Sequence, residues 1–160
     1  VDTVRAFSST DQHDPAFFYA DPRLSDTGLQ RIAQATAGEL GVSFHGETDY
    51  RTTPQEEVSL ESIDRFLLQL SCQAELPEVQ AHTFLTSPDS SGSATVAVVG
   101  SAITGGPERN LQGFLSQALK RRVTHQSAAE DPLAALASYL TSTRFREDRP
   151  EILIWLVPIW

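Results

Sequence analysis

The chain has 160 residues, of which 40% are hydrophobic, and this is enough for one domain with its own core. Its formal net charge of -9 at pH 7 and the lack of a long basic run exclude a typical nucleic-acid-binding surface. The single cysteine excludes an internal disulfide and a cysteine-based zinc site. No segment approaches the ~18 apolar residues that a membrane span needs.

The first half of the chain predicts alternating strands and helices. A strand is expected over residues 17–20, a helix over 27–40 and a strand over 42–44. A polar loop over 46–54, a helix over 59–72 and an extended run over 80–86 follow. Ser25 or Asp26 can cap the first helix, and Gly41, which tolerates a positive φ, ends it. The second helix is expected to place its helically spaced apolar residues on an inner face: Ile63, Phe66, Leu67 and Leu70.

The second half is organised around residues 95–100, whose continuous apolar run predicts a strand buried on both faces of a parallel sheet. A helix opening at Pro107, a strand over residues 122–125, a helix opening at Asp131 and a strand over residues 151–157 follow. The residues expected to face inward are Leu111, Phe114, Leu115, Ala118 and Leu119 in the first helix and Leu133, Leu136 and Leu140 in the second. This alternation predicts one three-layer α/β domain of the flavodoxin-like kind, over residues 1–160, with a mainly parallel central sheet.

Chemistry in open α/β sheets lies at the carboxyl ends of the strands, so residues 100–104 are where a nucleophile is expected. Gly105, before a helix, can help to receive an anion, although a tight turn is the simpler explanation of the Gly-Gly pair. The aromatic side chains near the second half of the sheet can contact a sugar ring or pack in the core: Tyr139, Trp155 and Trp160.

The remaining reactive side chains form no recognisable motif. His13, His45, His82 and His125 have no metal-ligand spacing, and His125 is the best reserve base because it follows a predicted strand. Cys72 lies beside a helix end and is expected to be packed. We expect no metal and no cofactor.

Several segments stand in an order that resembles the SGNH-hydrolase-like domain of bacterial alginate O-acetyltransferases. They are Phe18-Tyr-Ala-Asp-Pro-Arg-Leu-Ser-Asp-Thr-Gly28, Val99-Gly-Ser-Ala-Ile-Thr104, Asn110-Leu-Gln-Gly-Phe-Leu-Ser-Gln-Ala-Leu119 and Leu153-Ile-Trp-Leu-Val-Pro158. The family counterparts read Tyr-x-x-Asp-Thr-His-Trp-Thr-Pro-x-Gly, Val-Gly-Thr-Ser-Tyr-Ser, Asn-Phe-x-Gly-Phe-Leu-x-x-Ala-Leu and Leu-Ile-Trp-Glu-Phe-Pro. The resemblance spans nearly the whole chain and implies the same SGNH-like fold.

The resemblance implies serine acyl transfer, in which a serine attacks an acetyl donor, a histidine accepts its proton and an aspartate orients the histidine. Position by position, the aspartate falls on Asp21, the histidine on Arg23 and the serine on Ala102, with Ser101 directly before it. Arginine stays protonated and alanine has no nucleophile, so Asp21 and Arg23 are expected to form an ion pair or to leave Arg23 in solvent. The candidates for an oxyanion or ligand site are Gly100, Gly105 and Asn110.

These residues predict a family member that has lost its catalytic groups. It would act as a binding or scaffolding component in exopolysaccharide acetylation or export, with an acidic exopolysaccharide and other proteins of that process as partners. Two alternatives stay open: an active polysaccharide O-acetyltransferase or acetylesterase that uses Ser101, and a partial chain whose working residues lie before Val1 or after Trp160. The resemblance implies a periplasmic location.

Overall fold

The centre of the protein is a three-stranded parallel sheet. The structure, a computed structural model, describes residues 15–19, 21, 23–73, 75–89, 95–100, 109–127 and 131–157. The sheet contains β3 (Val96–Gly100), β4 (Val123–Ser127) and β5 (Ile152–Leu156) in the order β4-β3-β5. Val98 lies opposite His125 on one side and Ile154 on the other, so β3 is paired along both edges.

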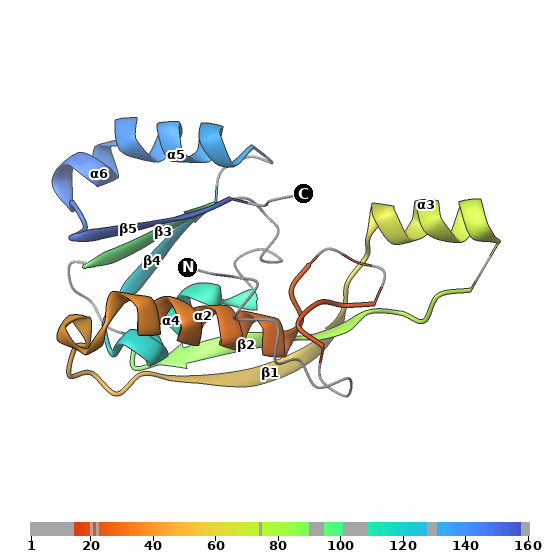
Figure 1. Cartoon of the computed structure of the whole chain (residues 1–160), viewed down its shortest axis with the longest axis horizontal. Coiled ribbons are helices and arrows are strands. Elements are labelled where there is room, and N and C mark those ends of the chain that lie inside the picture. The colour runs from red at the N-terminus through yellow and green to blue at the C-terminus, as the bar shows by residue number, and fades with distance from the viewer. Residues whose placement is uncertain are drawn as a thin grey trace.

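Helices cover both faces of this sheet (Figure 1). α2 (Asp26–Leu40) and α4 (Leu111–Leu119) lie on one face, and α5 (Pro132–Thr141) and the short α6 (Thr143–Glu147) lie on the other. All five residues of β3 are buried, so its apolar side chains are covered on both faces. The predicted three-layer α/β fold with a parallel central sheet is confirmed.

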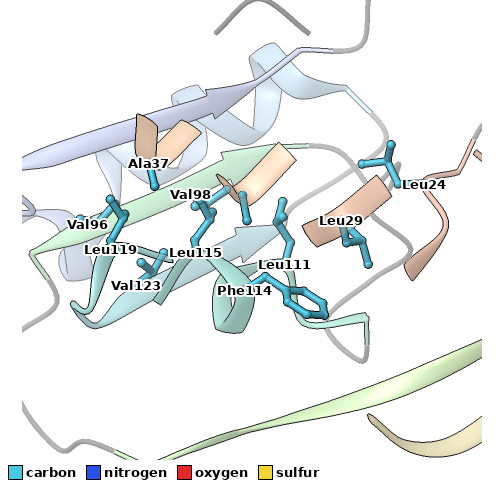
Figure 2. Close-up of a cluster of buried hydrophobic side chains, with 11 residues drawn as sticks. Leu24, Leu29, Ala37, Val96, Val98, Leu111, Phe114, Leu115, Leu119 and Val123 are labelled. Carbon is cyan, nitrogen blue, oxygen red and sulfur yellow. The ribbon is translucent and has the colours of Figure 1, made fainter. Parts of the chain in front are cut away.

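Two apolar clusters hold the layers together. In the larger one, Val96 and Val98 of β3 pack with the inner face of α4 and with α2 (Figure 2). The smaller one places Ala97 and Val99 against α5. Alternate residues of one strand therefore feed opposite cores, as the pleat of a strand requires. The larger cluster contains Leu24, Leu29, Ala33, Ala37, Val96, Val98, Leu111, Phe114, Leu115, Leu119 and Val123.

The helix ends follow the local signals in the sequence. The Ser25 hydroxyl accepts a hydrogen bond from the Gly28 N–H at the start of α2, and Gly41 follows its end with a φ of 78°. Asp131 caps α5, whose first residue is a proline. α4 begins after Asn110, while the expected helix start at Pro107 lies outside the described residues. These caps satisfy backbone groups that a helix end would otherwise leave unpaired.

The connections of β3, β4 and β5 locate a crevice. The chain leaves β3, passes through α4 to β4 on one side, and returns through α5 and α6 to β5 on the other side. The direction of the crossover reverses at β3, and in open α/β sheets such a reversal opens a ligand crevice beyond the carboxyl ends of the strands. Gly100, the last residue of β3, lies at this edge.

A two-stranded antiparallel arm extends from this domain. β1 (Arg51–Ser59) pairs with β2 (Gln80–Ser87), and α3 (Ile63–Cys72) connects them at the far end of the arm (Figure 1). The other end of the arm is joined to the helical layer, where the Thr52 N–H donates to the Gln117 side-chain oxygen at 2.7 Å. α3 therefore stands away from the three layers.

Several local expectations are wrong. Residues 42–44 form a 3-10 helix rather than a strand, and the segment around residue 17 makes only an isolated bridge between Phe17 and Leu24. β1 begins at Arg51, inside the expected loop, because pairing with β2 extends it. The second helix begins at Ile63, after a Ser62 cap, rather than near residue 59.

Two helices present a different face to the core than their periodicity predicts. The apolar residues of α3 are exposed, because no layer covers the far end of the arm: Ile63, Phe66, Leu67 and Leu70. In α5 the buried residues are Ala135 and Tyr139, while Leu133 and Leu140 are exposed. Cys72, expected to be packed, is also exposed.

The close approach of β5 to the end of β3 can be tested at Gly100. A Cβ on Gly100 would lie 2.6 Å from the Leu156 Cβ, so we expect Gly100→Ala to lower the free energy of unfolding by about 1–3 kcal/mol, measured by urea denaturation. Gly38→Ala in α2 is the matched control, because nothing lies within 4 Å of that position. Alanine there should raise the free energy of unfolding by up to ~1 kcal/mol. Equal responses would contradict the close packing of β5 on Gly100.

Candidate functional site

Asp21 and Arg23 lie in a tight turn directly before α2. The turn is closed by the Phe18 N–H, which donates to the Arg23 carbonyl at 3.2 Å, and by the Asp21 N–H, which donates to the Phe18 carbonyl. The Ser25 N–H donates to the Ala16 carbonyl at 2.9 Å. These backbone bonds fix the Asp-x-Arg segment at the start of the helix.

The side chains of Asp21 and Arg23 form a bidentate ion pair. The Arg23 Nε donates to Asp21 Oδ1 at 2.9 Å, and Nη2 donates to Oδ2 at 2.7 Å. The Asp21 side chain is fully buried, and 20% of the Arg23 side chain is exposed. Burial raises the pKa of Asp21, but the hydrogen bonds and charge of Arg23 outweigh it, so the pKa lies below its ordinary value of 3.8. The expected ion pair is confirmed.

This pair has no proton acceptor that works near neutral pH. Both carboxylate oxygens of Asp21 are occupied by Arg23, and a guanidinium does not give up its proton in proteins. This ion pair therefore offers no acid–base chemistry at the two positions that the resemblance assigns to an Asp–His couple. Ser101, Ala102 and Gly105 lie outside the described residues, so their roles stay predictions.

Asn110 has a structural role that the sequence did not indicate. Its amide nitrogen donates to the Phe84 carbonyl at 3.1 Å and to the Thr86 hydroxyl at 2.9 Å, while its amide oxygen accepts from the Gly113 N–H. The residue has a φ of 53° and caps α4. The first two hydrogen bonds fasten the helix start to β2 and use both amide N–H groups, so the amide is not free to stabilise an oxyanion.

The two described aromatic candidates for sugar contact differ in exposure. Tyr139 is buried and packs edge-on against Phe145, with ring centroids 5.4 Å apart. It is a core residue, and its burial raises its pKa above 10.0. Trp155 on β5 is 42% exposed, and its indole N–H donates to the Pro132 carbonyl at 2.9 Å. The expectation that Tyr139 and Trp155 share an aromatic platform is therefore wrong.

An Asp–His pair involves Asp26, the first residue of α2. Asp26 Oδ2 lies 2.8 Å from His82 Nδ1 on β2, and Asp26 Oδ1 lies 2.5 Å from Arg109 Nη1. The Arg109 side chain is 1% exposed and also donates to the carbonyls of Leu24 and His82. Its guanidinium lies 5.3 Å from the centroid of the Phe18 ring. This buried cation holds α2, β2 and the start of α4 together.

The Asp26–His82 pair has the hydrogen bond that orients an imidazole in acid–base catalysis. The His82 side chain is 43% exposed. Sequence reasoning missed the pair because 56 residues separate its members and neither stands in a recognisable motif. Asp26 was considered only as a helix cap.

A groove of about 570 Å³ lies between the arm, α4 and β4. Arg122 and Arg144 line it together with the aromatic residues Tyr50 and Phe84 and the carboxylate of Asp89. His125 also lines it, inside β4 rather than after the strand, and burial lowers its pKa below 6.5. Its Nε2 is buried without a hydrogen-bond partner. The groove thus presents two cations beside an imidazole whose Nε2 is buried.

Within the described ranges, no group of three His, Cys, Asp or Glu side chains is arranged to hold a metal ion. None of the helices in the same part of the chain combines the length and apolar character that crossing a membrane requires.

Comparison with known proteins identifies the family. The family described as "ALGX: SGNH hydrolase-like domain, acetyltransferase AlgX" matches residues 1–159, so the chain belongs to it, and the resemblance found in the motifs is confirmed. The probable alginate O-acetylase AlgJ of Pseudomonas fluorescens is 41% identical over 66 residues. That match covers 39% of this chain and 16% of the relative.

Two solved structures have the same fold. AlgX of Pseudomonas aeruginosa matches with a TM-score of 0.76 and 21% identity, over 92% of this chain and 36% of that chain. The O-acetyltransferase domain of Pseudomonas putida AlgJ matches with a TM-score of 0.80 and 22% identity, over 96% of this chain and 56% of that one. The chain therefore spans about half or less of the length of these relatives.

Replacing Arg23 tests the energetic role of the ion pair. Arg23→Ala leaves the buried Asp21 carboxylate without its main partner, so we expect the free energy of unfolding at pH 7 to fall by about 2–3 kcal/mol. The folded pKa of Asp21 is lowered, so the contribution of the pair is present above the ordinary pKa and is lost as pH falls through the folded pKa. Denaturation at several pH values should show the two proteins converging in acid.

The control is Arg51→Ala. It removes an ion pair with Asp49 in which both side chains are at least 75% exposed, and such pairs contribute little. A loss as large as that of Arg23→Ala, or a difference that persists in acid, would contradict the importance of the Asp21–Arg23 pair.

Proposed function

We propose that this protein is a catalytically degenerate member of its acetyltransferase family and serves as a binding or scaffolding component in the O-acetylation or export of an acidic exopolysaccharide. The relative AlgJ of Pseudomonas fluorescens is named a probable alginate O-acetylase, which favours alginate or a similar polyuronate as the polymer. By the same relationship we propose that the protein works in the periplasm.

The bidentate Asp21–Arg23 pair carries the proposal. A serine nucleophile needs a neighbouring group that accepts its proton. At the family position of that group this protein has a guanidinium, and both of its hydrogen bonds to Asp21 are already formed. The side chain is thus a permanent cation that stabilises the turn. By the motif resemblance, the family serine position falls on Ala102, which has no nucleophile.

The groove between the arm, α4 and β4 is the surface that we assign to polysaccharide binding. A uronate ring offers a carboxylate, several hydroxyl groups and an apolar face. Arg122 and Arg144 provide charge for the carboxylate, and Phe84 provides an aromatic side chain in the same groove. A volume of about 570 Å³ suits a short segment of polymer better than a protein surface.

An active acetyltransferase or acetylesterase that uses Ser101 is the second candidate. The Asp26–His82 pair favours it, because an aspartate hydrogen-bonded to one ring nitrogen leaves the other available as a base. In that case His82 would accept the Ser101 hydroxyl proton as the oxygen attacks the acetyl carbonyl. The alcohol of the donor would leave with a proton, and an acetyl-serine would remain.

The two functions predict different results with a chromogenic acetate ester. For a degenerate member, turnover by the wild-type protein should equal that by Ser101→Ala and by His82→Ala, all at the rate of buffer alone. A rate above background that disappears in both variants, with a pH profile controlled by one basic group, would establish the active enzyme instead. The Arg51→Ala variant, which alters only an exposed ion pair with Asp49, is the control for effects of mutation in general.

Binding to the polymer tests the groove. We expect polymannuronate oligosaccharides to bind the wild-type protein in calorimetry and to bind Arg144→Ala about tenfold more weakly, because one charge-assisted contact is lost. Arg146→Ala on the same helix is the matched control, since Arg146 does not line the groove. Affinity should also fall as salt rises. An equal loss of affinity in the two variants would contradict the assignment of the groove to polysaccharide binding.

A further inference from the structure

The exposed side of α3 is the largest departure from ordinary surface chemistry in the described part of the protein. Ile63, Phe66, Leu67 and Leu70 fall at helical spacing on one side, and between 53% and 73% of each residue is exposed. Leu68 is 41% exposed as well. A helix of ten residues is about 15 Å long, so these side chains form one contiguous apolar surface, which we call the α3 surface. Exposed patches of this kind usually mark binding sites.

The opposite side of α3 is anchored by polar groups. Arg65 is only 7% exposed, and it donates to the Tyr19 carbonyl at 2.6 Å and to the Pro77 carbonyl. The Gln69 side chain donates to the Leu76 carbonyl at 3.3 Å. The helix therefore buries an arginine and exposes its leucines, the reverse of a normal surface helix. These anchors fix the orientation that turns the apolar side outward.

A hollow with a mixed lining extends the α3 surface. It has a volume of about 440 Å³ and lies beside the first turns of the helix, where Leu60, Ile63, Phe66 and Leu76 form its apolar part and Glu61, Arg65 and Glu78 its charged part. It can accept a large apolar side chain of a partner. The surface therefore combines a ridge and an adjacent hollow, as helix-binding sites do.

The charges around the α3 surface select its partner. Six exposed acidic residues lie on α3 and the chain next to it: Glu56, Glu57, Glu61, Asp64, Glu75 and Glu78. The one basic residue between positions 52 and 80 is Arg65, whose guanidinium is bound to carbonyl oxygens. A second copy would bring the same acidic rim, and an anionic lipid surface would be repelled. Basic side chains would be attracted.

From these features we propose that the α3 surface binds an amphipathic helix of another protein, whose apolar face is bordered by lysines or arginines. The apolar residues of that helix lie along α3, and one of them enters the hollow beside Phe66. Its flanking cations face the acidic rim. This surface shares no residue with the groove assigned to polysaccharide, so the proposal stands independently of that function.

The test uses two synthetic helices of about 20 residues, long enough to be helical in water. Both carry leucines on one face, and the flanks carry lysines in one and glutamates in the other. In fluorescence anisotropy with the whole chain, the lysine-flanked helix should bind saturably and more weakly at high salt. Phe66→Ser/Leu70→Ser should weaken binding at least about tenfold, while Leu133→Ser, which alters an exposed leucine of α5, should not change it.

A second variant guards against loss of folding. Glu61→Lys/Glu78→Lys keeps the apolar residues and should also weaken binding of the lysine-flanked helix, with an unchanged circular dichroism spectrum. Failure of that helix to bind, or equal binding of both helices, would overturn the proposal. A dimer that the Phe66→Ser/Leu70→Ser variant abolishes would also overturn it, because the α3 surface would then bind a second copy. Co-flotation with vesicles of phosphatidylethanolamine and phosphatidylglycerol would overturn it as well, because the surface would then bind lipid.

Discussion

Burial of β3 on both faces and along both edges is the constraint from which the rest of the architecture follows. Its five residues are fully enclosed, so helices must cover both sides of the sheet, and the chain must leave β3 towards one side and come back on the other. That reversal places the carboxyl end of β3 at a crevice. Gly100 marks this end because Leu156 of β5 lies where a side chain would project. The position of this crevice is thus a consequence of enclosing one short apolar strand.

Two carboxylates stand at or just before the start of α2 and have different partners. Asp21 is buried against the guanidinium of Arg23, which does not accept a proton. Five residues later, Asp26 contacts both the imidazole of His82 and the buried Arg109. Arg109 binds groups from α2, β2 and the loop before α2, so the same ion cluster joins the arm to the layered domain. Stability and possible chemistry therefore depend on neighbouring but separate ion pairs.

The arm connects two surfaces of opposite character. The end of β2 near Thr86 lines a groove that contains Arg122 and Arg144, whereas the other end carries α3 with its apolar side chains and acidic rim. A protein with a net charge of -9 that gathers cations in a groove attracts anions there without attracting them elsewhere. This separation of charge is compatible with one partner being an acidic polymer and the other a basic helix. It also gives a protein without a proton acceptor beside Asp21 a physical basis for bringing components together.

The sequence by itself determined the features that depend on neighbours in the chain. The Ser25 cap, the Gly41 stop, the Asp131 cap and the enclosed strand all follow from local hydrogen bonding, backbone freedom or an uninterrupted apolar run, and the motif order identified the family. The assignment of Arg23 to the family histidine position rests on one motif and stays a prediction. Only the tertiary structure decided which face of α3 meets solvent, since periodicity places side chains on one side of a helix and does not say what covers that side. It alone joined Asp26 to His82 across 56 residues, because contacts between distant segments depend on how the layers pack.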